Sequence, residues 1–178
     1  KGMGKKGLNE LLKFVDDGGI VVSWEASIEL FNQTLSIDKG KDIKEDFRLP
    51  FREIGSNLRS QGWYCPGSLV KIQLLPNHPL TYGMPAELGV FSRGYPVFQT
   101  SIPSFDMDRR VIGKFPEKGI FMSGYVEKEE LLANKSAMIW LKKGKGQLVL
   151  FGFNPQFRAS TQGAFKLLFN SLLLPKLK

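Results

Sequence analysis

Apolar residues in the first part of the chain recur at regular intervals that predict alternating helices and strands. Residues 8–15 carry apolar side chains at the spacing of an amphipathic helix. The run Asp16-Asp17-Gly18-Gly19 ends that helix, because glycine suits the left-handed position past a helix terminus. Residues 20–24 are short and β-branched, which predicts a buried strand, and a second helix is predicted over 26–32. This order of elements is typical of a parallel α/β layer.

The middle of the chain is richer in predicted strands. Residues 34–62 are polar and charged with little periodicity, which predicts an irregular excursion with one helical turn. Residues 68–74 alternate well enough for a strand, and Pro76-Asn77-His78-Pro79-Leu80 interrupts it. Further short strands are predicted over 89–92, 96–100, 110–115 and 120–122.

The last part of the chain predicts a β-hairpin between two helices. A short helix is predicted over 127–133. Strands over 137–141 and 147–151 flank a glycine-containing turn. A closing helix over 161–173 has one wide apolar face, and Ser160-Thr161 supplies its cap. Together these elements predict a single α/β domain over residues 1–178, with a partly parallel sheet and added β-hairpins.

Length and charge exclude several classes of protein. The 178 residues suit one domain with a sizeable core. The net charge is +8, but the lysines form short scattered clusters, and no segment interleaves arginine with aromatic residues as a base-stacking platform would. We therefore expect solvated surface lysines and no nucleic-acid partner. No stretch approaches the roughly 20 apolar residues of a membrane span, so none is expected. Because the chain begins at Lys1 and not Met, we expect a processed protein or an excerpt from a longer one.

The single cysteine and single histidine limit the available chemistry. Cys65 cannot form an internal disulfide, and Pro66 follows it in a context typical of a turn and a partly buried thiol. His78 stands alone in a loop, which excludes a zinc site of two or three histidines. We expect no metal site, no cofactor in this chain and a structural role for His78.

One segment points to a known turn. Gly152-Phe153-Asn154-Pro155-Gln156-Phe157-Arg158 follows an apolar strand and precedes an apolar helix. It resembles the Phe-His-Pro-Glu turn of class I glutamine amidotransferases. Asn154 stands where the resemblance places the base histidine, and Gln156 where it places the orienting glutamate. The polarity of the turn is kept and its proton chemistry is lost.

The resemblance extends along most of the chain. From Gly7 to Leu174 the sequence resembles the C-terminal amidotransferase-like domain of bacterial proteins that carry an M14-type zinc carboxypeptidase domain. The matching segments are 11–19, Cys65-Pro66-Gly67-Ser68, His78-Pro79-Leu80-Thr81-Tyr82-Gly83-Met84-Pro85, Ser123-Gly124-Tyr125, Gly144-Lys145-Gly146, 152–159 and 165–170.

Several expectations come from this resemblance alone. It implies an amidotransferase-like, flavodoxin-like fold whose N-terminal part is missing here, because the family has a first strand and helix before the match at Gly7. It implies an upstream peptidase domain as partner, with zinc held there, in a secreted or periplasmic metallocarboxypeptidase.

The candidate site lies where the predicted strands end. A working amidotransferase needs a thiolate at a sharp strand-to-helix turn, but Glu25 stands there and Ser23 lies earlier. Ligands in open α/β sheets bind at the carboxyl ends of strands. The candidate ligand-binding residues at those ends are Glu25, Asn154, Gln156 and Arg158.

Arg158 could hold a carboxylate of a small anionic ligand in bidentate fashion. Alternatively, Gln156 and Arg158 only satisfy backbone groups in a tight loop.

These residues predict a non-catalytic accessory domain that packs against the peptidase or binds a ligand at the relic site. Two alternatives remain open. One is a free-standing carbohydrate- or peptide-binding module. The other is a hydrolase that uses Cys65 or Ser23 as nucleophile.

Overall fold

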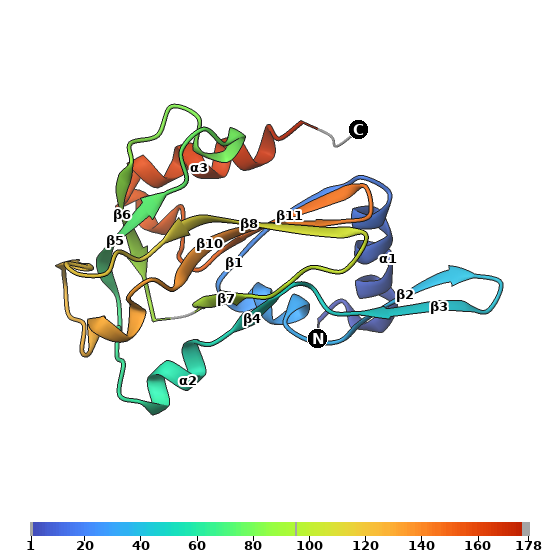
Figure 1. Ribbon diagram of the computed structural model, residues 1–178, viewed down its shortest axis with the longest axis horizontal. Helices are drawn as coiled ribbons and strands as arrows, with labels where there is room; N and C mark the ends of the chain where they lie inside the picture. The colour runs from blue at the N-terminus through green and yellow to red at the C-terminus, as the bar shows by residue number, and fades with distance from the viewer. Residues whose placement is uncertain (1, 95, 176–178) are drawn as a thin grey trace.

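The computed structural model describes residues 2–94 and 96–175. A curled sheet runs through the molecule, with strand order β1-β11-β10-β8-β5-β6 and with β4, β7 and β9 attached beside this path (Figure 1). The strands are β1 (Ile20–Trp24), β2 (Leu35–Gly40), β3 (Ile43–Phe47), β4 (Phe51–Glu53), β5 (Ser68–Leu74), β6 (Glu87–Ser92), β7 (Phe98–Thr100), β8 (Met107–Lys114), β9 (Phe121–Ser123), β10 (Ser136–Lys143) and β11 (Gly146–Phe151). The α-helices are α1 (Gly4–Asp16), α2 (Gly55–Ser60) and α3 (Gln162–Leu172), and the 3-10 helices are η1 (Glu25–Phe31), η2 (Pro79–Thr81), η3 (Glu129–Leu132) and η4 (Phe157–Ala159).

Two helices cover opposite faces of the central strands. Successive residues of a strand point to opposite faces, and β11 is apolar on both. Val149 and Phe151 belong to the core under α3, whereas Leu148 and Leu150 belong to the core under α1. Both faces of β11 are buried, which explains why this strand is a continuous apolar run.

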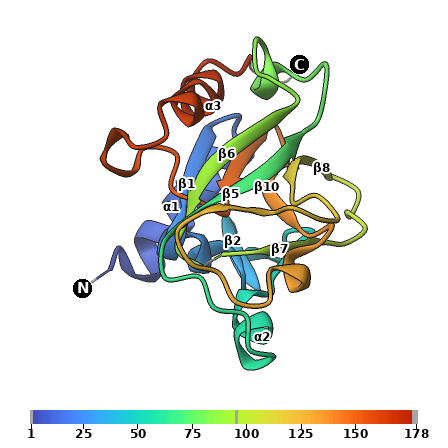
Figure 2. The same ribbon diagram turned by 90° about the vertical axis from the view of Figure 1, so that its left-hand side faces the viewer.

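The α/β class predicted from the sequence is confirmed, and the sheet is partly parallel. β1 pairs with β11 in parallel, while β10 pairs with β11 and β8 in antiparallel fashion. β5 joins β8 through two residue pairs, and β5 and β6 lie at the end of the molecule that faces the viewer in Figure 2. An isolated bridge between Phe91 and Asn154 brings the end of β6 beside the segment that follows β11.

Four local predictions are wrong. Residues 34–62 contain the predicted helical turn as α2 but are not irregular, because β2 and β3 form an antiparallel hairpin whose Leu35 and Ile37 enter the core. The helices predicted over 26–32 and 127–133 are the 3-10 helices η1 and η3. Thr161 occupies the N-cap position of α3, but its side chain makes no capping hydrogen bond.

A buried lysine ties four segments together. Lys143, 1% exposed, lies 3.1 Å from Asp16, 3.0 Å from Glu45 and in contact with Asp106. Lys39 also bridges Asp16 and Glu45, at 3.3 Å and 2.7 Å. These five residues, the Lys143 cluster, join the end of α1, the β2–β3 hairpin and the segment before β8 to the end of β10.

The charges in this cluster stabilise one another. Burial alone would lower the pKa of Lys143, but its hydrogen bonds to the three carboxylates raise it well above its ordinary value. The pKa of Glu45 is lowered by its hydrogen bonds to Lys39 and Lys143. Burial would raise the pKa of Asp16, yet the same two lysines lower it overall.

Candidate functional site

A strained turn follows β1 directly. Trp24 is extended, and Glu25 has a φ of 51°, so the chain reverses sharply into η1. A non-glycine residue in this left-handed region costs about 1–3 kcal/mol and persists only where the surrounding structure enforces it. Here Ser27 donates a hydrogen bond to the carbonyl oxygen of Trp24 at 2.6 Å and contacts Ser23 at 2.6 Å. A strained strand-to-helix turn is the geometry that presents a nucleophile in hydrolases, and in this chain it presents a carboxylate.

Asn154 lies beside this turn. Its side-chain amide donates to Glu25 Oε1 at 3.2 Å, and its Oδ1 accepts from the backbone N–H of Gln156 at 3.0 Å. Its backbone N–H donates to the carbonyl oxygen of Phe91 at 3.1 Å. Asn154 is buried and connects the ends of β1, β6 and β11. The structure therefore brings Glu25 and Asn154 together at the sheet edge where the sequence predicted both.

Gln156 and Arg158 lie farther out on the same loop. Both side chains are exposed, and Arg158 has a φ of 46°. The guanidinium carbon of Arg158 lies 5.5 Å from the centroid of the Phe157 ring. Within residues 2–94 and 96–175, neither side chain hydrogen-bonds to Glu25 or Asn154. Gln156 satisfies Asn154 Oδ1 through its backbone N–H. In the described part of the chain, neither the Gln156 nor the Arg158 side chain hydrogen-bonds to a backbone group, which is what the alternative of a loop-satisfying role would require.

An aromatic pair that sequence reasoning missed forms the wall next to this loop. The rings of Phe91 and Phe157 stack with centroids 3.9 Å apart and planes within 5°. Phe91 lies in β6, sixty-six positions before Phe157 in the printed sequence, and no local pattern indicates the pairing. The Glu25 elbow, Asn154, Arg158 and this pair form the edge site.

Cys65 lies beside the end of β6, near Phe91, but its side chain is buried in the core. It is buried, and its thiol donates to the carbonyl oxygen of Ser92 at 3.4 Å. Burial raises the pKa of this thiol, which opposes the thiolate that a nucleophile requires. Ser23 is also buried.

His78 lies at the other end of β5 from Cys65. Seven strand residues separate the two segments, which corresponds to about 20 Å. His78 Nδ1 accepts from the backbone N–H of Leu80 at 3.2 Å, and its ring packs edge-on against Trp140 at 6.2 Å. Burial, with a smaller contribution from Arg110, lowers the pKa of His78. These contacts agree with the structural role predicted for His78. Because His78 lies about 20 Å from Cys65, it cannot act as a base for that thiol.

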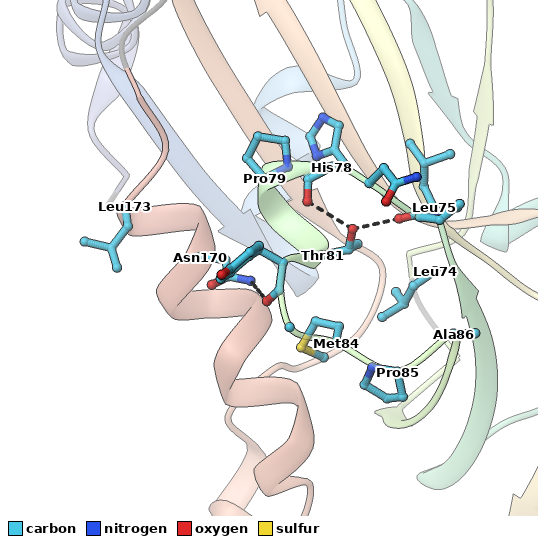
Figure 3. Close-up of a pocket in the computed structure, with 14 residues that line it drawn as sticks. Leu74, Leu75, His78, Pro79, Thr81, Met84, Pro85, Ala86, Asn170 and Leu173 are labelled. Atoms are coloured by element: carbon cyan, nitrogen blue, oxygen red, sulfur yellow. Dashed lines mark hydrogen bonds between the residues drawn. The ribbon is translucent and has the colours of Figure 1, made fainter.

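The His78 loop borders a cavity of about 950 Å³ (Figure 3). Asn170 in α3 and Leu173 just after it line one side of the cavity. Leu74 and Leu75 at the end of β5, and Ala86 just before β6, line the other side. Glu25, Asn154, Gln156 and Arg158 are not among its lining residues. Sequence reasoning missed this cavity, because the loop and α3 are far apart along the chain.

Across residues 2–94 and 96–175, no three histidine, cysteine, aspartate or glutamate side chains come together as metal ligands would. In the same residues, no helix has the length and apolar character needed to cross a membrane.

Comparisons with known proteins complete the description. No protein-family model matches the chain, and a search of curated protein sequences finds no match. Among solved structures, it is similar to a ThuA-like protein from Bacteroides uniformis, with 11% identity, a TM-score of 0.49 and coverage of 97% of this chain and 64% of that protein. It is also similar to a cytoplasmic protein from Salmonella typhimurium, with 15% identity, a TM-score of 0.48 and coverage of 97% and 61%.

A third similar structure is a cold-adapted beta-galactosidase from Rahnella, with 10% identity, a TM-score of 0.46 and coverage of 95% of this chain and 21% of that enzyme. The chain spans less than two thirds of each of these three proteins. At these identities and TM-scores, the three structures do not indicate which residues of this chain are functional.

Proposed function

We propose that this chain is a non-catalytic ligand-binding module that uses the edge site. One observation carries the proposal: the strained turn after β1 holds Glu25, and its carboxylate is hydrogen-bonded to the amide of Asn154. A side-chain amide does not accept a proton near neutral pH, so Asn154 cannot act as the general base that a histidine would be. Its amide instead holds the Glu25 carboxylate in place, where that carboxylate can accept a hydrogen bond from a polar ligand.

The composition of the edge site indicates the kind of ligand. Glu25 is half-buried and accepts hydrogen bonds from hydroxyl or ammonium groups. Arg158 is exposed and offers a guanidinium that pairs with a carboxylate in bidentate fashion. The ring pair Phe91 and Phe157 supplies an apolar surface beside them. We therefore propose a small anionic, sugar or peptide ligand that spans the Glu25 and Arg158 ends.

A panel of such ligands tests this function by thermal shift. A ligand that binds only the native state at about 100 times its Kd stabilises it by about 2.7 kcal/mol, which raises the Tm. Acidic sugars, neutral oligosaccharides and short peptides are the probes. Arg158→Gly removes the guanidinium and suits the positive φ, so we expect it to reduce the shift given by carboxylate ligands. The matched control is Lys41→Gly, which removes one positive charge at an exposed residue with a φ of 49°. A shift that both variants reduce equally, or no shift from any probe, contradicts the proposal.

The parent protein is part of the same proposal. The resemblance from Gly7 to Leu174 supports an accessory role beside an M14-type zinc carboxypeptidase domain, with the zinc in that domain and the protein secreted or periplasmic. The coding sequence upstream of Lys1 tests it. An upstream His-x-x-Glu with a later histidine and a leader peptide supports the parentage. A start codon immediately before Lys1 contradicts it and favours a free-standing binding module.

A hydrolase is the competing function. It would require Cys65 or Ser23 as nucleophile, and both side chains are buried. Wild type, Cys65→Ala and Ser23→Ala can be compared on amide and ester substrates. We expect no rate that depends on either residue, and a rate that disappears in one variant would replace the binding proposal with an enzyme.

A further inference from the structure

The cavity beyond the C-terminal end of β5 has the size and walls of a binding site. Ligand pockets in proteins are mostly apolar and measure about 300–1,000 Å³, and this one measures about 950 Å³. It lies apart from the edge site, at the opposite end of β5. Its apolar lining is formed by Leu74, Leu75, Pro76, Pro79, Met84 and Leu173.

The apolar surface continues onto the outside of the molecule around this cavity. Leu173 is 80% exposed and Tyr82 is 78% exposed, and both line the cavity. Large apolar side chains grouped around a hollow are typical of interaction sites, whereas single exposed ones are ordinary. The cavity therefore offers apolar contacts both inside and at its mouth.

Polar side chains that line the cavity hydrogen-bond to the backbone of the surrounding loop. Thr81 donates its hydroxyl to the carbonyl oxygen of Leu75 at 2.7 Å, and the Asn170 amide donates to the carbonyl oxygens of Leu80 at 2.9 Å and Tyr82 at 3.1 Å. Figure 3 shows Thr81 of η2 bonded to Leu75 at the end of β5, and Asn170 reaching from α3 to the same loop. The loop is thus fixed to α3 before any ligand arrives, which lowers the entropic cost of binding.

In the described part of the chain, the lining of the cavity contains no aspartate, glutamate, lysine or arginine, and one basic side chain, Lys166, stands beside its Gly83 rim. Lys166 lies four residues before Asn170 and seven before Leu173, so all three share one face of α3. Its ammonium group packs against the loop at Gly83, where an added Cβ would lie 2.4 Å from Lys166 Nζ. Within residues 2–94 and 96–175, no acidic side chain forms an ion pair with Lys166.

We propose that this cavity binds an amphiphile with one apolar chain and one anionic head group, of which a medium-chain fatty acid is the simplest example. The chain lies against Leu74, Met84 and Leu173. The head group lies at the Gly83 rim, where Lys166 is the nearest cation. A cationic amphiphile of the same length would lose this contact and gain repulsion. The proposal does not depend on the edge site or on its ligand.

Calorimetric titration with sodium decanoate, below its micelle concentration, tests this proposal. We expect saturable binding with one site per chain, and markedly weaker binding of decyltrimethylammonium. Lys166→Glu is expected to weaken decanoate binding by about tenfold, because each 1.4 kcal/mol is a factor of ten and an ion pair near a surface contributes about that much when reversed to repulsion. Lys118→Glu is the matched control, since Lys118 is exposed on the loop between β8 and β9 and does not line the cavity.

A second variant tests the apolar part without disturbing the fold. Leu173→Asn replaces an apolar contact with an uncharged polar side chain at the mouth of the cavity, at a residue that is already exposed, and it should weaken both amphiphiles. Amide NMR shifts on decanoate addition should fall at residues 82–86 and 166–173, and not at 24–25 or 154–158. Equal affinity for the two amphiphiles, equal effects of Lys166→Glu and Lys118→Glu, decanoate binding unchanged by Leu173→Asn, or no binding at all would each overturn the proposal.

Discussion

The Lys143 cluster and the Glu25 elbow both join charged or polar side chains from distant segments, but their surroundings differ. Lys143 is 1% exposed and contacts three carboxylates. Glu25 is half-buried, holds one amide partner and has a φ of 51°. In the first, a buried cation is paired with three partly exposed carboxylates; in the second, a half-buried carboxylate has one partner among the described residues and a strained backbone.

This difference separates structural from functional polar groups. A buried charge must be paired, because an isolated one costs several kcal/mol, so the Lys143 cluster is explained by the fold alone. Backbone strain concentrates at functional sites, where it presents a side chain that packing would otherwise hide. The Glu25 carboxylate is half-buried and has one hydrogen-bond partner within the described chain, the Asn154 amide, so the need to pair a buried charge does not explain it, which favours a ligand.

The largest expected effect is on stability, at Lys143. Lys143→Met leaves Asp16, Glu45 and Asp106 close together without their central cation, so we expect the free energy of unfolding to fall by about 3–5 kcal/mol. Urea denaturation measures it. Lys142→Met is the control, because Lys142 is the next residue of β10 and points to the opposite face. Similar losses in the two variants would show that the cluster adds no specific stability.

The next effect is the pH dependence that this cluster imposes. The pKa values of Asp16 and Glu45 are lowered in the folded state. Their contribution to stability is therefore complete above their unfolded pKa values, near 4, and is lost as the pH falls through the folded ones. Urea midpoints measured from about pH 6 to pH 2 should fall for the wild type. The fall should be shallower in Lys143→Met, and an identical profile would contradict the assignment.

A smaller effect of opposite sign is expected at the elbow. Glu25→Gly removes the strain of a positive φ, so we expect it to stabilise the fold by about 1 kcal/mol while it removes the proposed ligand contact. Asp42→Gly is the control, since it removes a carboxylate at a φ of 61° in the exposed β2–β3 turn. It should change stability in the same direction and leave ligand binding unchanged. Destabilisation by Glu25→Gly would mean that the carboxylate has a structural role.

The smallest effect concerns Cys65, which lies at the edge of the same site. Burial raises the pKa of its thiol, so alkylation by iodoacetamide at pH 8 should be slow in the native protein and should accelerate only as urea unfolds it. Rapid alkylation of the folded protein would show an accessible thiolate and would revive the hydrolase alternative.

The elements that the sequence predicted well are those with a strong local pattern. β1, β5 and β11 are short apolar or alternating runs bounded by glycine or proline, and their predicted bounds match to within one residue. The β2–β3 hairpin was missed because its charged residues dominate the segment and hide the alternation of Leu35 and Ile37. The Lys143 cluster is invisible in the sequence, since its acids come from three separate segments.

In the candidate site, too, the residues with a local signal were predicted and those that depend on long-range packing were not. Glu25 and Asn154 were predicted together because each follows one of two strands expected to end at the same edge, and β1 and β11 are parallel neighbours. Arg158 was expected among them, and its exposed side chain hydrogen-bonds to neither Glu25 nor Asn154 in the described part of the chain. The Phe91–Phe157 stack and the cavity beyond β5 depend on the curl of the sheet and on the packing of α3. No local pattern encodes either.

The most direct test of the central claim is an amide NMR titration of the isotopically labelled protein with acidic sugars, neutral oligosaccharides and short peptides, followed for hours in the same sample. The account predicts shifts at the amides of Glu25 and Asn154 with at least one ligand, unchanged ligand signals over time, and loss of these shifts in Glu25→Gly. Ligand turnover that disappears in Cys65→Ala, or the absence of shifts at Glu25 and Asn154 with every ligand, would contradict it.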